Sequence, residues 1–213
     1  MKEEGARRRV VFTGAGLGGD GYPNASNVLR ILTDDPELSV RDCIGWLPEE
    51  FRLWKHARGS LFARLSGCVR LFFSDLRILP TVLMPWRTDV LIIPYPYITS
   101  LLLLSLIPRR FRLPIIVDVY NSLWISLVED RGLERSKGSF ARLLKWLERR
   151  ALRTADVLVV DTQKNAEQIV KTFGLPKATV RTSPLAFVDG IFSPESDSCD
   201  NGPLKVVFFG TMI

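Results

Sequence analysis

The feature that most constrains the fold is an alternation of short apolar runs with amphipathic segments in the second half of the chain. The apolar runs have the composition of strands buried on both faces of a sheet, and they lie at residues 90–93, 115–119 and 157–160. Helical spacing of apolar residues follows each run, at Ser100–Leu106, Ser139–Arg153 and Thr162–Phe173. Strands that alternate with helices form a parallel sheet, so we predict a doubly wound, Rossmann-like α/β fold.

Further elements follow from local signals. Thr162 is a suitable N-cap for the helix after the third run, and Gly174 is placed to end it. Residues 48–85 mix aromatic and basic residues and are predicted to hold one or two amphipathic helices. The remaining expected elements are strands at Arg9–Thr13, Ser39–Ile44 and Ala178–Thr182 and a helix at Asn24–Leu32.

The end of the sequence differs from the rest. Residues 184–203 contain three prolines and a polar run at 196–202, a composition typical of a linker. Residues 204–210 then form a new apolar, strand-like run. We therefore expect an α/β domain at 1–183, a linker at 184–203, and the first strand of a further, missing domain at 204–213.

Composition excludes several classes of protein. Apolar residues make up 46% of the chain and charged residues 24%, which suits a globular domain with a real core. Three scattered cysteines and one histidine predict a reducing compartment, no disulfide framework and no metal site. The basic amino terminus lacks the apolar stretch of a signal peptide, and Pro94 and Pro96 interrupt the most apolar segment, so we expect no membrane span. The net charge of +6 favours an anionic partner.

A glycine-rich segment follows the first expected strand. Five of the eight residues at positions 14–21 are glycine, which lets backbone amides approach an anion closely. Gly14, Gly16 and Gly19 match the dinucleotide fingerprint formally, with Asp42 at a suitable distance. That fingerprint requires a helix that starts among the glycines, whereas helical spacing here begins near Val28. A longer loop that contacts phosphate or sugar, or a purely structural turn, is favoured over dinucleotide binding.

Polar and aromatic residues follow the other strands, at the sheet edge where open parallel sheets bind ligands. Candidate ligand-binding residues are Tyr95, Asp118, Tyr120 and Asn121, whose groups hydrogen-bond to or stack on sugars. The alternative is that Asp118 or Asn121 caps a helix. Asp161 and Thr162 after the third run are expected to be capping residues.

Basic and aromatic residues interleave in two stretches, a pattern that suits a protein resting on anionic lipid. The residues expected on this membrane surface are Trp54, Arg58, Arg64, Arg109, Arg110 and Arg112. The basic residues at 142–153 fit either lipid contact or a solvated helix face. A nucleic-acid surface would carry the same charge, but no nucleic-acid motif is present, so no such partner is expected.

Four stretches, best from residue 89 onwards, resemble glycosyltransferase family 4, whose members have the two-domain GT-B fold. They are a strand and loop at 89–96, a strand and loop at 114–123, a basic helix with its strand at 144–162, and the segment at 184–194 that crosses between the two domains of the family. Residues 206–210 resemble the opening strand of the family's donor domain. The glycine loop fits the family as well. Some members have a histidine in the second of these loops, where Tyr120 and Asn121 stand here, so that role is not carried over.

The resemblance implies transfer of a sugar from a nucleotide-sugar to an acceptor hydroxyl, with a diphosphate leaving group. Gly16, Gly18 and Gly19 would face the donor phosphate or sugar, while Tyr95, Asp118, Tyr120 and Asn121 would position the acceptor. No catalytic residue is assigned, and no metal or cofactor is expected. The family's donor-phosphate residues lie in its second domain, so the chain corresponds to the acceptor-side, amino-terminal half, and little activity is expected of it alone.

The function predicted is therefore that of a glycosyltransferase component acting on a lipid-linked or polysaccharide acceptor in cell-surface polysaccharide or glycolipid synthesis. It would work in the cytoplasm, peripheral on the inner face of the plasma membrane, with a donor-binding domain in cis or in trans. Two alternatives remain: a non-catalytic subunit that binds acceptor or membrane, and a nicotinamide-dependent oxidoreductase.

Overall fold

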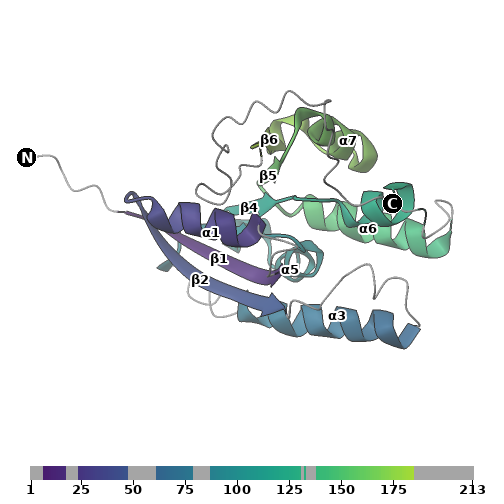
Figure 1. Ribbon diagram of the computed structural model, residues 1–213, viewed down its shortest axis with the longest axis horizontal. Helices are drawn as coiled ribbons and strands as arrows, with labels where there is room; N and C mark the ends of the chain where they lie inside the picture. Colours follow the sequence, from purple (N-terminus) through teal and green to yellow (C-terminus); the bar gives the residue numbers. More distant parts are fainter. Residues whose placement is uncertain are drawn as a thin grey trace, which may run out of the picture.

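The computed structural model describes residues 7–17, 24–47, 61–78, 87–130, 132 and 138–184. Its centre is a six-stranded sheet in the order β2-β1-β3-β4-β5-β6, in which every neighbouring pair is parallel (Figure 1). The strands are β1 (Arg8–Leu17), β2 (Leu38–Leu47), β3 (Val90–Ile93), β4 (Ile115–Asp118), β5 (Val157–Val160) and β6 (Val180–Thr182). The Rossmann-like α/β fold predicted from the sequence is confirmed.

Helices cover the two faces of the sheet unequally. The α-helices are α1 (Asn24–Asp34), α3 (Leu61–Asp75), α5 (Ile98–Leu104), α6 (Ser139–Leu152) and α7 (Gln163–Phe173). Side chains alternate between the faces of a strand, so the core clusters show which helix covers which face. Phe12 and Ile92 pack in one cluster with Val28, Leu29 and Leu32 of α1.

The opposite face carries the larger core. On β3, β4 and β5, the side chains that point to this face include Ile93, Val117 and Leu158. They pack with buried residues of α5, α6 and α7. Helix α3 contacts α5 and so lies on the same side, away from α1 (Figure 1). Of the described helices, only α1 covers the other face, and Val157 and Val159 of β5 are half-buried.

Short helical turns complete the described structure. They are 3₁₀ turns at η1 (Leu76–Ile78), η3 (Arg109–Phe111) and η5 (Lys177–Thr179), and a π-helix at η4 (Ile125–Asp130). Sequence analysis missed η4, and it assigned 178–179 to a strand, whereas these residues belong to η5 and β6 begins at Val180. Within the described ranges, no helix combines the length and apolarity needed to span a membrane.

The ends of α7 confirm the capping prediction. The Thr162 hydroxyl accepts a hydrogen bond from the Asn165 backbone N–H at 3.2 Å. Gly174 ends the helix in the left-handed conformation, with φ of 59°. Both signals are local, so the sequence alone was sufficient to place them.

The first two strands are longer than predicted. β1 and β2 pair residue by residue from Arg8 with Leu38 to Leu17 with Leu47. Gly14 and Gly16, expected in a loop, therefore belong to β1. A Cβ at Gly16 would lie 2.6 Å from Cγ2 of Ile44, so this glycine permits close packing against β2. The linker predicted at 184–203 and the strand predicted at 204–213 lie, apart from Pro184, outside the described residues.

Candidate functional site

The site is built where the parallel strands end. Asp118 is the last residue of β4, Asp161 directly follows β5, and Ser183 directly follows β6. These strands are adjacent and in parallel register, so their carboxyl ends meet at one edge. Asn24, the first residue of α1, approaches the same edge, because its side-chain amide donates a hydrogen bond to Oδ2 of Asp118 at 2.7 Å.

Asp118 is electrostatically unusual. The pKa of its carboxyl group is raised from 3.8 to about 6, mainly by burial and also by the nearby charge of Asp161, while the hydrogen bond from Asn24 opposes the rise. A carboxyl group with a pKa near neutrality exchanges a proton readily at physiological pH. Asp118 is thus suited to accept a hydrogen bond, or a proton, from a hydroxyl group.

Two tyrosines flank this carboxyl group. The ring of Tyr95 lies edge-to-face with that of Tyr120, with centroids 6.2 Å apart, and both rings line a small depression with Asp118 and Asn24. Tyr120 is 36% exposed, so part of its ring is accessible. Aromatic rings beside polar groups are typical of sites that bind sugars or polar head groups.

A polar pocket of about 320 Å³ opens on one side of Tyr120. It lies between the loop after β4, the π-helix η4 and the first turns of α7. Its lining is Val119, Tyr120, Asn121, Ser122, Ile125, Asp130, Asp161, Asn165, Gln168 and Ile169. π-helical turns are frequent at functional sites, and this one supplies Ile125 and Asp130 to the wall.

An apolar groove of about 330 Å³ opens on the other side of Tyr120. It follows the part of the sheet that α1 leaves uncovered, with Ile92, Ile116 and Val159 on the strands and Val28, Ile31 and Leu32 on α1. Asp118 and Asp161 also line it. Tyr120 and Asp161 line both cavities, so the two lie side by side.

Buried carboxylates hold the surrounding scaffold, and Glu148 of α6 is the clearest example. It is fully buried and accepts hydrogen bonds from the Tyr97 hydroxyl at 2.7 Å, the Leu123 N–H at 3.0 Å and the Trp124 N–H at 2.7 Å. Burial raises its pKa, and these hydrogen bonds oppose the rise. Glu148 therefore anchors the loop after β4 to α6.

Asp75, the last residue of α3, is a second buried carboxylate that holds neighbouring elements together. It is fully buried and accepts hydrogen bonds from the Ala15 N–H at 2.8 Å and from the hydroxyls of Thr99 and Ser100. Burial raises the pKa of Asp75, and its three donors oppose the rise. This carboxylate joins β1, α3 and the start of α5.

The structure brings together most of the acceptor residues predicted from the sequence. Tyr95, Asp118 and Tyr120 meet at the edge, while Asn121 lies in the polar pocket on the other side of Tyr120. Of the glycines predicted to face the donor, Gly16 is in β1, and Gly18 and Gly19 lie outside the described residues. Because Gly14 and Gly16 belong to a strand, they do not form the turn of a dinucleotide fingerprint.

Sequence reasoning missed several residues of the site. Asp161 was assigned to capping, but Thr162 caps α7, and Asp161 instead accepts a hydrogen bond from the Asn165 side chain at 2.6 Å. Asn24 was predicted only as the first residue of a helix. A signal existed for Glu148, since it lies four residues from both Leu144 and Leu152 on the apolar side of α6.

The predicted membrane surface is described only in part. Trp54 and Arg58 lie outside the described residues, as does the side chain of Arg64. Arg109 and Arg110 of η3 are exposed, and Arg112 is half-buried. Arg109 forms a salt bridge with Asp156 at 3.2 Å, which attaches η3 to the start of β5.

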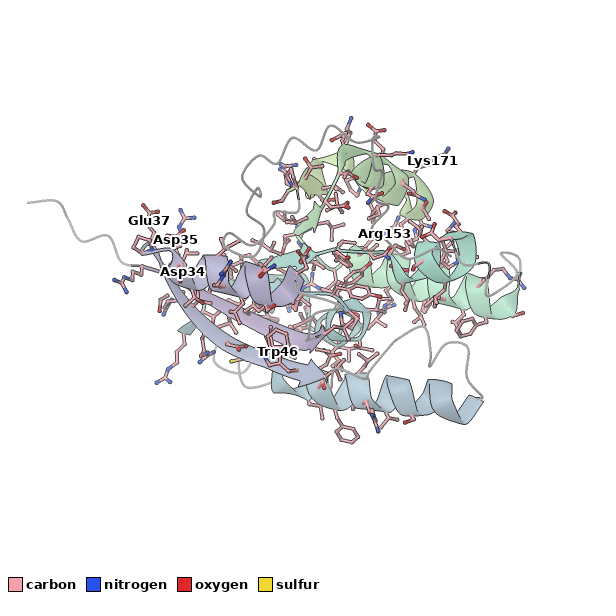
Figure 2. All side chains as sticks on the ribbon, in the orientation of Figure 1. Asp34, Asp35, Glu37, Trp46, Arg153 and Lys171 are labelled. Carbon is pink, nitrogen blue, oxygen red and sulfur yellow. The ribbon has the colours of Figure 1, made fainter. Side chains whose placement is uncertain are left out.

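The charge of the site limits its chemistry. No lysine or arginine lines the polar pocket, the apolar groove or the depression beside Tyr95, as far as the described residues extend. In the described part of the chain, no three potential metal ligands from His, Cys, Asp and Glu are grouped. The exposed acids Asp34, Asp35 and Glu37 lie near the opposite end of the strands (Figure 2). The described part of this edge has groups that can bind and orient hydroxyl groups, and its described lining has no cation for a phosphate.

The sequence was compared with models of known protein families and with curated proteins. The model of a family described as "Glycosyl transferase 4-like domain" matches residues 4–186, which includes every described element. No curated protein matches the chain.

Proposed function

The chain belongs to the family of glycosyl transferase 4-like domains, and from this premise we propose that it provides the acceptor side of a transferase that moves a sugar from a nucleotide-sugar to a lipid-linked or glycan hydroxyl. The observation that supports the proposal is the position of Asp118. It ends β4, lines the apolar groove and, together with Tyr95 and Tyr120, the small depression, and has a pKa raised to about 6. An acceptor hydroxyl at this point would have a carboxyl group to align it.

The reaction also requires stabilisation of the departing diphosphate, usually by cationic side chains or backbone N–H groups. The described cavities at the strand ends have acidic and amide groups but no lysine or arginine. We therefore propose that a donor-binding domain, in cis or in trans, supplies the positive charge. In that arrangement the residues of this chain bind and orient the acceptor.

A transfer assay tests the proposal. Nucleotide-sugars labelled in the sugar are incubated with lipid-linked acceptors extracted from the source organism, with this chain and a donor-binding domain. Label should pass from one donor to the lipid fraction, and Asp118→Ala should lower kcat/KM at least about tenfold, or ~1.4 kcal/mol of transition-state stabilisation. Glu37→Ala, at the far end of the sheet, is the control and should retain full activity.

Failure of this assay has a defined meaning. If no donor gives labelled product, the proposed transferase function is contradicted. If acceptor binds to the chain without transfer, the result supports a non-catalytic, acceptor-binding subunit instead.

We also propose that the α6 side of the molecule rests on an anionic membrane at the cytoplasmic face. Leu143 and Trp146 of α6 are 53% and 56% exposed, and Arg142, Arg149 and Arg150 are exposed on the same helix. The only acidic residue of α6, Glu148, is fully buried, so the exposed face of this helix carries only positive charge. Exposed apolar residues flanked by arginine are typical of interfacial helices.

Vesicle flotation tests the membrane proposal. The chain should float with vesicles that contain anionic lipid and not with neutral vesicles, and high salt should weaken the binding. Leu143→Ser combined with Trp146→Ser should release it, whereas Arg30→Glu on α1 should not. Equal flotation of the chain with neutral and anionic vesicles would contradict the proposal.

A further inference from the structure

The polar pocket differs from the rest of the surface in its charge. The chain has a net charge of +6, yet this pocket has two carboxyl groups, Asp130 and Asp161, and no basic residue among its described lining. A phosphate placed here would be repelled by both acids, and no lysine or arginine among the described lining residues would offset that repulsion. The pocket therefore suits a ligand that is rich in hydroxyl groups and carries no negative charge.

The polar side chains of this pocket are fixed in position. Asp161 accepts a hydrogen bond from the Asn165 side chain at 2.6 Å, and Thr162 holds the backbone of Asn165 at 3.2 Å. Gln168 donates a hydrogen bond to Glu129 of η4 at 3.1 Å, which joins the two walls. Groups held by such contacts lose little further freedom when a ligand binds.

The size of the pocket limits the ligand. Its volume of about 320 Å³ lies at the lower end of the range for small-molecule sites, so it accommodates a single sugar ring more readily than a whole nucleotide-sugar. Carboxylate and amide oxygens accept hydrogen bonds from sugar hydroxyls, and the exposed part of the Tyr120 ring can pack against a sugar face. The pocket also adjoins Asp118 through Tyr120 and Asp161, which line both cavities.

We propose that this polar pocket is an acceptor subsite for one phosphate-free sugar unit, either neutral or amino-bearing, bound by Asp161, Asn165 and Gln168. The proposal rests on the proposed function, because it specifies the chemistry of the acceptor. A sugar held here extends toward Asp118, where the acceptor hydroxyl that receives the transferred sugar would meet the donor. Any phosphate of a lipid-linked acceptor must then lie outside the pocket.

Saturation-transfer NMR on the 213-residue chain provides the test. The probes are the methyl glycosides of glucose, galactose and mannose, with N-acetylglucosamine and glucosamine, each paired with its 6-phosphate. At least one phosphate-free sugar should bind, and its 6-phosphate should bind at least fivefold more weakly. Asp161→Asn should weaken sugar binding about threefold or more and reduce the discrimination against phosphate.

Two further variants locate the binding. Gln168→Leu should weaken sugar binding while circular dichroism shows an intact fold. Lys171→Ala, an exposed position further along α7, should leave it unchanged (Figure 2). The proposal is overturned if none of the probes binds, if a 6-phosphate binds as well as its parent sugar, or if binding is the same in Asp161→Asn and Gln168→Leu as in the parent chain.

These results separate the subsite from the proposed function. Sugar binding that depends on Asp161, with no transfer from any nucleotide-sugar, would contradict the transferase proposal and retain the subsite. Transfer that proceeds equally well in Asp161→Asn, with no sugar binding detected, would contradict the subsite and retain the transferase.

Discussion

Replacement of Asp118 by asparagine is the sharpest test of the electrostatics at the strand ends. The change keeps the size of the side chain and removes its ionisation. In the described part of the chain, Asp118 accepts one hydrogen bond, from the Asn24 amide, and burial is the main reason that its pKa is raised. The ionised carboxylate of Asp118 therefore destabilises the folded protein, and replacing it with the neutral amide of asparagine should remove this destabilisation.

The expected size follows from the pKa difference. The pKa of Asp118 is 3.8 in the unfolded chain and about 6 in the folded one, which corresponds to about 3 kcal/mol at most. Between these values the folded state binds more protons than the unfolded state, so the contribution of Asp118 to stability is fully present below pH 3.8 and is lost as the pH rises to about 6. Above that pH the loss is constant.

Urea unfolding followed by circular dichroism from pH 3.5 to 8 measures this effect as a difference between the two proteins, which cancels the other titrating groups. The difference in the free energy of unfolding, Asp118→Asn minus the parent chain, should increase by about 1–3 kcal/mol between pH 4 and pH 6.5. Above pH 6.5 this difference should stay constant. The same variant should transfer sugar poorly, since sites that store strain commonly trade stability for activity.

Two results would refute this reasoning. If the difference between the two unfolding free energies does not change with pH, Asp118 is ionised normally in the folded protein. If the variant loses stability as the pH rises, the carboxylate is stabilised by contacts stronger than its desolvation. In either case the role proposed for Asp118 in accepting a proton or a hydroxyl hydrogen bond would lose its physical basis.

Three further changes test the scaffold by urea unfolding. Glu148→Ala leaves a buried hydroxyl and two buried N–H groups without their acceptor and should cost about 3–5 kcal/mol, against less than about 0.5 kcal/mol for the exposed control Glu37→Ala. A cost below about 1 kcal/mol would mean that water reaches this carboxylate. Gly174→Ala forces a Cβ into the left-handed conformation and should cost about 1–2 kcal/mol, and no loss would contradict the helix end described here. Thr162→Ala removes the cap of α7 and should cost about 1 kcal/mol, whereas Thr162→Ser should restore stability.

The parts of the fold that were predictable depend on neighbouring residues in the sequence. The cap at Thr162 and the stop at Gly174 act over three or four residues, and the apolar strands at 90–93 and 157–160 are evident from composition alone. The full length of β1 was not predictable in this way. Its last residues are held by pairing with β2, about thirty positions away, and Gly16 fits there because Ile44 leaves no room for a side chain.

The π-helix η4 (Ile125–Asp130) shows the same limit. The N–H groups of Leu123 and Trp124, just before it, donate hydrogen bonds to Glu148, which lies about 25 residues further along the chain. No local signal in this stretch reveals that partner. The position of Asp118, Tyr120 and Asn121 at this edge was predictable because residues that follow parallel strands gather at one edge, whereas the division of that edge into two cavities required the structure.

The number of donors that each buried carboxylate receives separates scaffold from site. Glu148 and Asp75 each accept at least three hydrogen bonds from different elements, so their charge is compensated and their removal should destabilise the fold. Among the described residues, Asp118 and Asp161 each accept one, from an asparagine, and both line the apolar groove. A carboxylate with a single donor keeps acceptor capacity that a ligand's hydroxyl groups can satisfy. Within the described residues the sheet edge thus concentrates carboxyl groups that have few donors. This supports the proposals that a hydroxyl-rich acceptor binds here and that a donor-binding domain supplies the cations.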